Sequence, residues 1–117
     1  MRPGELNIAL RHLDAAALCE SVYHALAVEF YPEDGVVIFV LNIDEIKEDI
    51  RRIYGQVAAE ELEERLKNLE LPEGVFFEEE GWLLYRCDVP EESEFSRIYI
   101  WDVVWSLTTT LMKAIKA

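Results

Sequence analysis

The sequence predicts an α+β protein: a two-layer sandwich in which an antiparallel sheet of two hairpins carries helices, in the order α-β-β-α-β-β-α with the middle helix broken. Three observations predict this class. Two pairs of β-branched and aromatic runs each fold back at a Gly-containing acidic turn. Apolar residues recur at helical spacing between the two hairpins, and a long apolar segment closes the chain.

The first expected elements are a helix and a hairpin. Asn7 is expected to cap a helix that ends near Tyr23, because apolar residues recur every three or four positions between them. Residues 27–31 and 36–41 are strand-like runs on either side of the turn 32–35. The second run is apolar on both faces, so it is expected to be a central, covered strand.

The middle of the chain predicts a helix with a break. Asn42 is expected to be the N-cap of this helix, with Glu45 three positions later. Gly55 predicts a break or kink at residues 54–56, since glycine costs about 1 kcal/mol in a helix relative to alanine. Pro72 is expected to end the second segment. The apolar face of the first segment is expected to contain Ile43, Ile46, Ile50, Ile53 and Val57, and that of the second Ala58, Leu62, Leu66 and Leu69.

A second hairpin and a closing helix complete the expected order. Residues 74–89 are expected to form the hairpin, whose Glu-rich turn is closed by Gly81. Alternation places Leu83, Tyr85 and Cys87 on one face of the returning strand, and Trp82, Leu84 and Arg86 on the other. The final helix is expected to begin between Ser93 and Arg97. Its narrow polar stripe is formed by Asp102, Ser106, Thr109, Lys113 and Lys116.

Composition indicates one acidic, folded domain over residues 1–117. The chain has 24 Asp and Glu against 11 Lys and Arg, a net charge of −13, yet 51% of it is apolar, which is too much for intrinsic disorder. The charge argues against nucleic acid and anionic lipid as direct partners, because Lys and Arg neutralise phosphate in such complexes. No run approaches the roughly 20 apolar residues of a membrane span, and no signal peptide is expected at the start.

The two cysteines favour a reduced, cytoplasmic protein. Cys19 and Cys87 lie among apolar neighbours, so they are expected to be reduced, buried thiols rather than a disulfide or a nucleophile. Few Asn and Gln beside many Glu favour a thermophilic source.

No catalytic residue, cofactor or metal site is predicted, and the chain is not expected to be an enzyme. His12 and Cys19 lie two helical turns apart, about 10.5 Å of rise, which is too far for a hydrogen bond. Glu20 and His24 at i, i+4 supply at most two metal ligands, whereas a site needs three or four. The carboxylates of the Glu-rich turn, Glu78, Glu79 and Glu80, are expected to be solvated rather than to bind a cation.

The second hairpin and closing helix carry a resemblance to a known family. Residues 71–90, LPEGVFFEEEGWLLYRCDVP, followed by a long helix, are similar to the corresponding part of the YbjN-like and type III secretion chaperone-like proteins. The resemblance covers about the last 50 to 60 residues and the element order. It implies an acidic homodimer that wraps an extended stretch of a client protein, with no catalytic fingerprint.

Two surfaces are candidates for binding. The apolar closing helix is expected to expose an interface that contains Trp101, Trp105 and Met112, through which the chain binds itself as a homodimer, with another protein as a further candidate partner. The second candidate is an acidic surface, because residues 60–94 hold 13 acids and 3 bases, a balance of −10. This surface is expected to contain Glu60, Glu61, Glu63, Glu64, Glu78, Glu79 and Glu80. The leading hypothesis is therefore a protein-binding or chaperone-like module, and the alternative is an acidic mimic of nucleic acid that inhibits a DNA- or RNA-binding protein.

Overall fold

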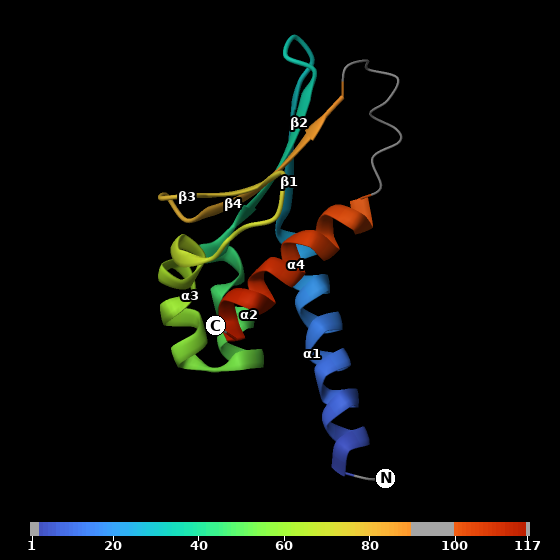
Figure 1. Ribbon diagram of the computed structural model, residues 1–117, viewed down its shortest axis with the longest axis vertical. Coiled ribbons are helices and arrows are strands. Elements are labelled where there is room, and N and C mark those ends of the chain that lie inside the picture. The colour runs from blue at the N-terminus through green and yellow to red at the C-terminus, as the bar shows by residue number, and fades with distance from the viewer. Residues whose placement is uncertain (1–2, 90–99, 117) are drawn as a thin grey trace.

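A computed structural model describes residues 3–89 and 100–116, with side chains described from residue 14 onward. Its elements confirm the expected order and the α+β class (Figure 1). They are α1 (Pro3–Ala25), β1 (Leu26–Tyr31), β2 (Val36–Asn42), α2 (Ile43–Tyr54), α3 (Gln56–Asn68), β3 (Val75–Glu78), β4 (Trp82–Asp88) and α4 (Ile100–Lys116). The predicted start of the last helix, between Ser93 and Arg97, lies outside the described residues.

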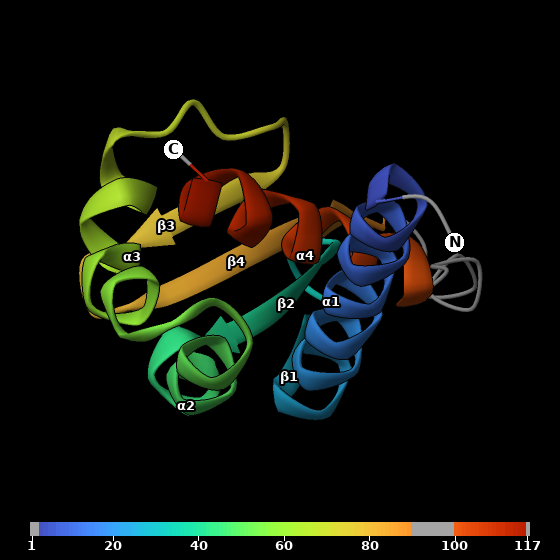
Figure 2. The same cartoon turned by 90° about the horizontal axis from the view of Figure 1, so that it is seen from below.

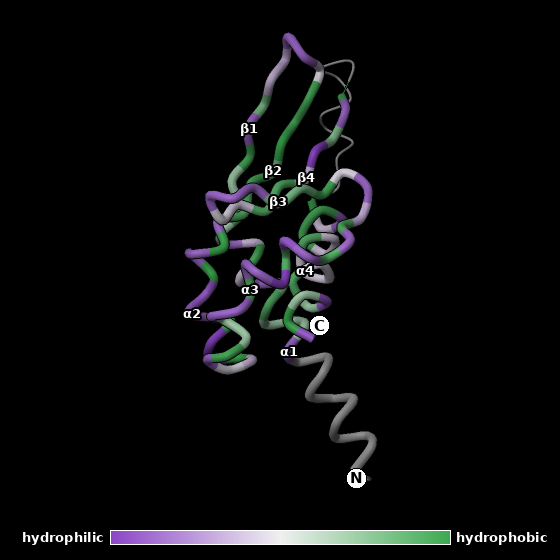
Figure 3. Tube along the Cα trace, turned by 60° about the vertical axis from the view of Figure 1, so that its left-hand side comes forward, coloured by the Kyte–Doolittle hydropathy of each residue, from purple (hydrophilic) through white to green (hydrophobic). Residues whose placement is uncertain are grey.

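The two hairpins join side by side into one antiparallel sheet of order β1-β2-β4-β3. β2 pairs with β4, so that Phe39 lies opposite Tyr85 and Leu41 opposite Leu83. The helices gather on one side of this sheet, as the two views show (Figure 1, Figure 2). β2 is thus a central strand, as its apolar sequence predicts, and it is hydrophobic along most of its length (Figure 3). The expectation that both of its faces are covered was wrong: because the helices lie on one side of the sheet, Ile38 and Val40 on the other side are only half-buried.

The core fills the space between the sheet and the helices. Alternate residues of β2 and β4 point into it, and the predicted division of the β4 side chains between two faces is confirmed. Its largest fully buried side chains are Leu18, Leu41, Ile43, Ile46, Ile50, Leu62, Leu66, Leu83, Leu107, Leu111, Val22 and Val37. Their burial supplies the main stabilisation of the fold, because apolar area removed from water is worth about 25 cal/mol per Å².

The first helix is longer than predicted. It begins at Pro3, four positions before the expected cap Asn7, and ends at Ala25 rather than near Tyr23. Proline suits the first position of a helix, because the N–H that it lacks has no helical acceptor there. The start predicted at Asn7 was therefore wrong, since the cap preference of one side chain does not exclude a helix that continues through it.

The break in the middle helix is confirmed. Asn42 caps α2, and its side chain accepts a hydrogen bond of 2.9 Å from the backbone N–H of Asp44. Gly55, with a φ of +102°, ends α2 and precedes α3. Because the chain changes direction there, Val57 leaves the apolar face of α2 and is 58% exposed, contrary to the prediction.

The last helix, α4, lies between α1 and α3 and contacts both (Figure 2). Arg65 of α3 donates a hydrogen bond to the backbone carbonyl of Ile115 and so holds the C-terminal end of α4. Two buried hydroxyls on α4, those of Thr108 and Thr110, donate to backbone carbonyls four residues earlier, at 2.7 and 2.8 Å. Each helix in the described chain is too short or too polar to span a lipid bilayer.

Candidate functional site

The exposed side of α4 is the feature of the molecule that most needs a functional explanation. Its residues share one face of the helix, because their spacing of 3 or 4 brings them round the same side. We call this surface the α4 face; it consists of Trp101, Asp102, Trp105, Thr109, Met112, Lys113 and Lys116. The opposite side of the helix is buried against the core, so α4 has an apolar inner surface and an outer surface on which large apolar side chains lie among the polar ones.

Large aromatic rings lie exposed on the α4 face. Trp101 is 47% exposed and Trp105 is 53% exposed, whereas Met112 is half-buried. The ring of Tyr23 from α1 stacks on Trp101, with 4.9 Å between centroids and 14° between planes. The structure thus places both predicted tryptophans outside the core and adds Tyr23, which the sequence alone did not single out. Aromatic residues are enriched at the centres of protein interfaces.

A hollow of about 230 Å³ opens on the C-terminal half of the α4 face. It is lined by Trp105, Thr109, Met112, Lys113 and Lys116, and its walls are almost wholly apolar. The lysine stems supply apolar surface while their ammonium groups remain in water. The hollow is therefore suited to an apolar side chain whose neighbours are negatively charged.

The charge of α4 differs from that of the rest of the chain. It carries Lys113 and Lys116 against Asp102, a balance of 2 − 1 = +1. Among the helices and strands that the structure describes, it is the one with a positive balance. Two copies that each carry −13 repel one another. This repulsion is weakest when the two copies approach each other through α4.

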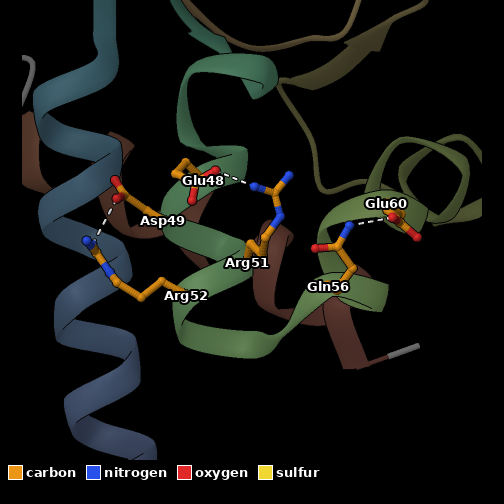
Figure 4. A network of polar contacts seen from close by, with 6 residues as sticks. All are labelled: Glu48, Asp49, Arg51, Arg52, Gln56 and Glu60. Atoms are coloured by element: carbon orange, nitrogen blue, oxygen red, sulfur yellow. Dashed lines mark hydrogen bonds and ion pairs between the residues drawn. The ribbon is translucent and has the colours of Figure 1, made fainter.

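Four glutamates of the predicted acidic surface, Glu60, Glu61, Glu63 and Glu64, lie on α3, which packs against α2 and its bases. The two helices hold 8 acids and 5 bases, a balance of 5 − 8 = −3. Several of the acids lie within reach of a side-chain donor, as the close view shows (Figure 4). The figure shows the ion pairs Glu48–Arg51 and Asp49–Arg52 and the hydrogen bond from Gln56 to Glu60. A further ion pair, outside this view, joins Glu61 to Arg65. Glu60 and Glu64 of the predicted glutamates are exposed.

Glu63 has a structural position rather than a purely surface one. Its Oε1 lies 2.7 Å from Lys47 Nζ, which is also 3.0 Å from Asp44 Oδ1. The hydrogen bond to Glu63, opposed by partial burial, raises the pKa of Lys47 above its ordinary value. This contact joins α2 to α3, so Glu63 is partly withdrawn from the acidic surface.

The remaining predicted glutamates lie at the β3–β4 turn. Glu78 ends β3, and Glu79 and Glu80 follow it; all three side chains are exposed. No group of three or more His, Cys, Asp or Glu side chains that could hold a metal ion occurs where side chains are described.

The structure also locates most of the side chains that the sequence suggested for catalysis or metal binding. Glu20 Oε1 and His24 Nε2 lie 3.8 Å apart on exposed parts of α1, beside an open groove of about 500 Å³ between α1 and α2. The side chain of His12 lies outside the described ones, so its distance from Cys19 is not defined. Cys19 and Cys87 are both free and half-buried. Burial, and secondly the charge of Asp88, raises the pKa of the Cys87 thiol, which disfavours the nucleophilic thiolate.

A second apolar surface lies on the side of the sheet that faces away from the helices. The pairing of strands aligns Ala27, Val40, Leu84 and Phe76 in one row across it. Phe76 is 51% exposed, and Trp82 lies beside this row, also exposed. We call this row the outer sheet face. Alternation in the second hairpin indicated which residues share this face, but not that helices would leave it open.

No protein-family model, curated protein or solved structure matches this chain.

Proposed function

We propose that this protein is a non-enzymatic protein-binding module, chaperone-like in role, that acts as a homodimer. The observation that carries the proposal is the α4 face, which exposes two tryptophans about half-way and holds an apolar hollow that one of them, Trp105, lines. Rings of this size in water leave unburied area that a partner would cover, and such aromatic anchors dominate binding energy in many interfaces. A second copy is the partner that the charge of α4 favours, since this helix is the least acidic one available.

The outer sheet face is the proposed site for another polypeptide. It lies on the other side of the sheet from α4, so the two surfaces are available at the same time (Figure 2). The partner is expected to be an extended, basic segment with apolar residues, because the chain carries −13 and the row offers apolar contacts.

Tryptophan fluorescence tests the self-association directly. In a Trp82→Phe variant, Trp101 and Trp105 are the remaining indole rings. We expect their emission to lie at shorter wavelength in concentrated solution and to move to longer wavelength on dilution, as the rings return to water. A spectrum that is the same across a thousandfold dilution, in a folded protein whose mass stays that of one chain, would show that no second copy covers the α4 face.

The alternative function, an acidic mimic of nucleic acid, receives less support from the geometry. A mimic needs a surface of unpaired carboxylates in place of phosphates, whereas Glu61 and Glu63 of the predicted acidic surface are ion-paired with Arg65 and Lys47. Its test is separate. If the alternative holds, replacing Glu78, Glu79 and Glu80 by Gln abolishes binding to a basic protein partner and leaves self-association intact.

A further inference from the structure

We propose that two copies of this chain pair through antiparallel α4 helices, with the two-fold axis of the dimer passing near Thr109. The inference rests on the proposed function, because it specifies the homodimer. It follows from the order in which charged residues, apolar residues and residues that line the hollow succeed one another along the α4 face.

The charged residues are arranged symmetrically about Thr109. Asp102 precedes Thr109 by seven residues and Lys116 follows it by seven, which is about 10.5 Å of helix on either side. Seven residues are close to two full turns, so the three side chains lie in one line along the α4 face. In an antiparallel pair centred on Thr109, each Asp102 therefore meets Lys116 of the other copy, and the contact forms twice.

The apolar positions are complementary in the same register. A two-fold axis at residue 109 places Trp105 opposite position 113 of the second copy. That position belongs to the lining of the hollow, together with Met112. The ring of each Trp105 thus enters the hollow of the other copy, where it meets a thioether and two lysine stems. One helix face supplies both the projecting ring and the cavity that receives it, as an isologous dimer requires.

A parallel arrangement of the two helices lacks these contacts. It would place Asp102 against Asp102, and Lys113 and Lys116 against their own copies, so like charges would meet at both ends. The position of Tyr23 agrees with the antiparallel pair, because its stack on Trp101 extends the N-terminal end of the face toward the lysines of the second copy. A single pair of 17-residue helices is a small interface, so we expect a dissociation constant of about 1–100 µM.

Charge reversal with rescue is the experiment that tests this register. Asp102→Lys and Lys116→Asp each replace two attractive contacts of the dimer by two repulsive ones. We expect each single variant to dissociate about tenfold more readily or worse, as measured by sedimentation velocity at low salt. The double variant Asp102→Lys with Lys116→Asp restores the attraction and the net charge of the unmodified chain, so its dissociation constant returns to within about threefold of the original.

Two controls separate the interface from other causes. Asp34→Lys, at the exposed tip of the first hairpin, changes the net charge as Asp102→Lys does and is expected to leave association unweakened. Both Asp102 and Lys116 also interact favourably with the dipole of α4. If each single variant weakened the dimer only by destabilising α4, the double variant would have the highest dissociation constant of the three. If the two charges pair across the dimer, the double variant has the lowest.

A cysteine at the symmetry axis provides a second measurement. Thr109→Cys is expected to form a disulfide between two copies under mild oxidation, because a residue on a two-fold axis meets itself. Val57→Cys, on α3 and more exposed, serves as the control and is expected to give little of this product.

The outcomes distinguish this inference from the proposal on which it rests. A dimer that the double variant does not restore and that Thr109→Cys does not cross-link would overturn the antiparallel register while leaving the homodimer in place. A chain that stays monomeric at every concentration would overturn both.

Discussion

Trp105 is the residue whose removal is expected to affect association most. It is 53% exposed in the single chain, and a large aromatic side chain buries about 150–250 Å² when fully covered. The area that a second copy can still cover is therefore about 80–130 Å² per chain. At about 25 cal/mol per Å² this corresponds to about 2–3 kcal/mol per ring. Truncation of a tryptophan at the centre of an interface commonly costs at least about 2 kcal/mol.

Trp105→Ala removes this contact from both sides of the dimer. The expected loss is about 4 kcal/mol of association free energy, or about a thousandfold in the dissociation constant. A dimer that dissociates at micromolar concentration then becomes monomeric throughout the range of sedimentation velocity. Thermal unfolding of the variant shows whether the monomer remains folded.

Phe76→Ala is the matched control for this prediction. Phe76 is 51% exposed but lies on the outer sheet face, away from α4, so its removal is expected to leave the dissociation constant unchanged. The reasoning is refuted if Trp105→Ala still forms the dimer with its original affinity, or if Phe76→Ala weakens it equally.

Three further predictions concern the fold. Tyr54→Phe is expected to leave the free energy of unfolding unchanged or to raise it by up to about 1 kcal/mol in urea titrations. The reason is that the buried Tyr54 hydroxyl finds no hydrogen-bond partner among the described residues, and a loss of stability above about 1 kcal/mol would reveal such a partner. Gly55→Ala is expected to destabilise the fold by about 1–2 kcal/mol through its φ of +102° alone, since nothing lies within 4 Å of the added Cβ. A gain in stability would instead place Gly55 in a regular helix. Burial raises the pKa of Cys87 above 9.0 and that of Tyr85 above 10.0, so the unfolded chain loses these protons first and the urea midpoint is expected to fall as pH rises from about 9 to 11. A midpoint independent of pH in this range would contradict the burial of these two groups.

Local sequence patterns were sufficient to predict the elements of this fold. The isoleucines of α2 recur at helical spacing, Gly55 marks the break, and the two apolar runs of each hairpin flank a turn, so every described element was expected in its order. The exceptions have physical reasons. Val57 follows the period of α2, but the backbone turns at Gly55 before it is reached. Asn7 is a good cap that a longer helix passes through.

The exposure of the candidate site could not be predicted in the same way. The helical spacing of apolar residues places Trp101 and Trp105 on α4, but it does not determine whether the sheet, another helix or solvent lies beside them. That depends on how α1 and α3 pack around α4, which is set by contacts far apart in sequence. The same holds for Tyr23, whose stack on Trp101 joins residues 78 positions apart, 101 − 23.

The central claim, that the α4 face is covered by a second copy of the chain, is tested most directly by the mass of the unmodified protein in solution. Sedimentation equilibrium from about 1 to 200 µM at near-physiological salt gives this mass without any variant or label. The chain has a mass of 13.6 kDa, so we predict a weight-average mass that rises with concentration toward 2 × 13.6 = 27.2 kDa and does not exceed it. A mass that stays at 13.6 kDa over the whole range would contradict the claim.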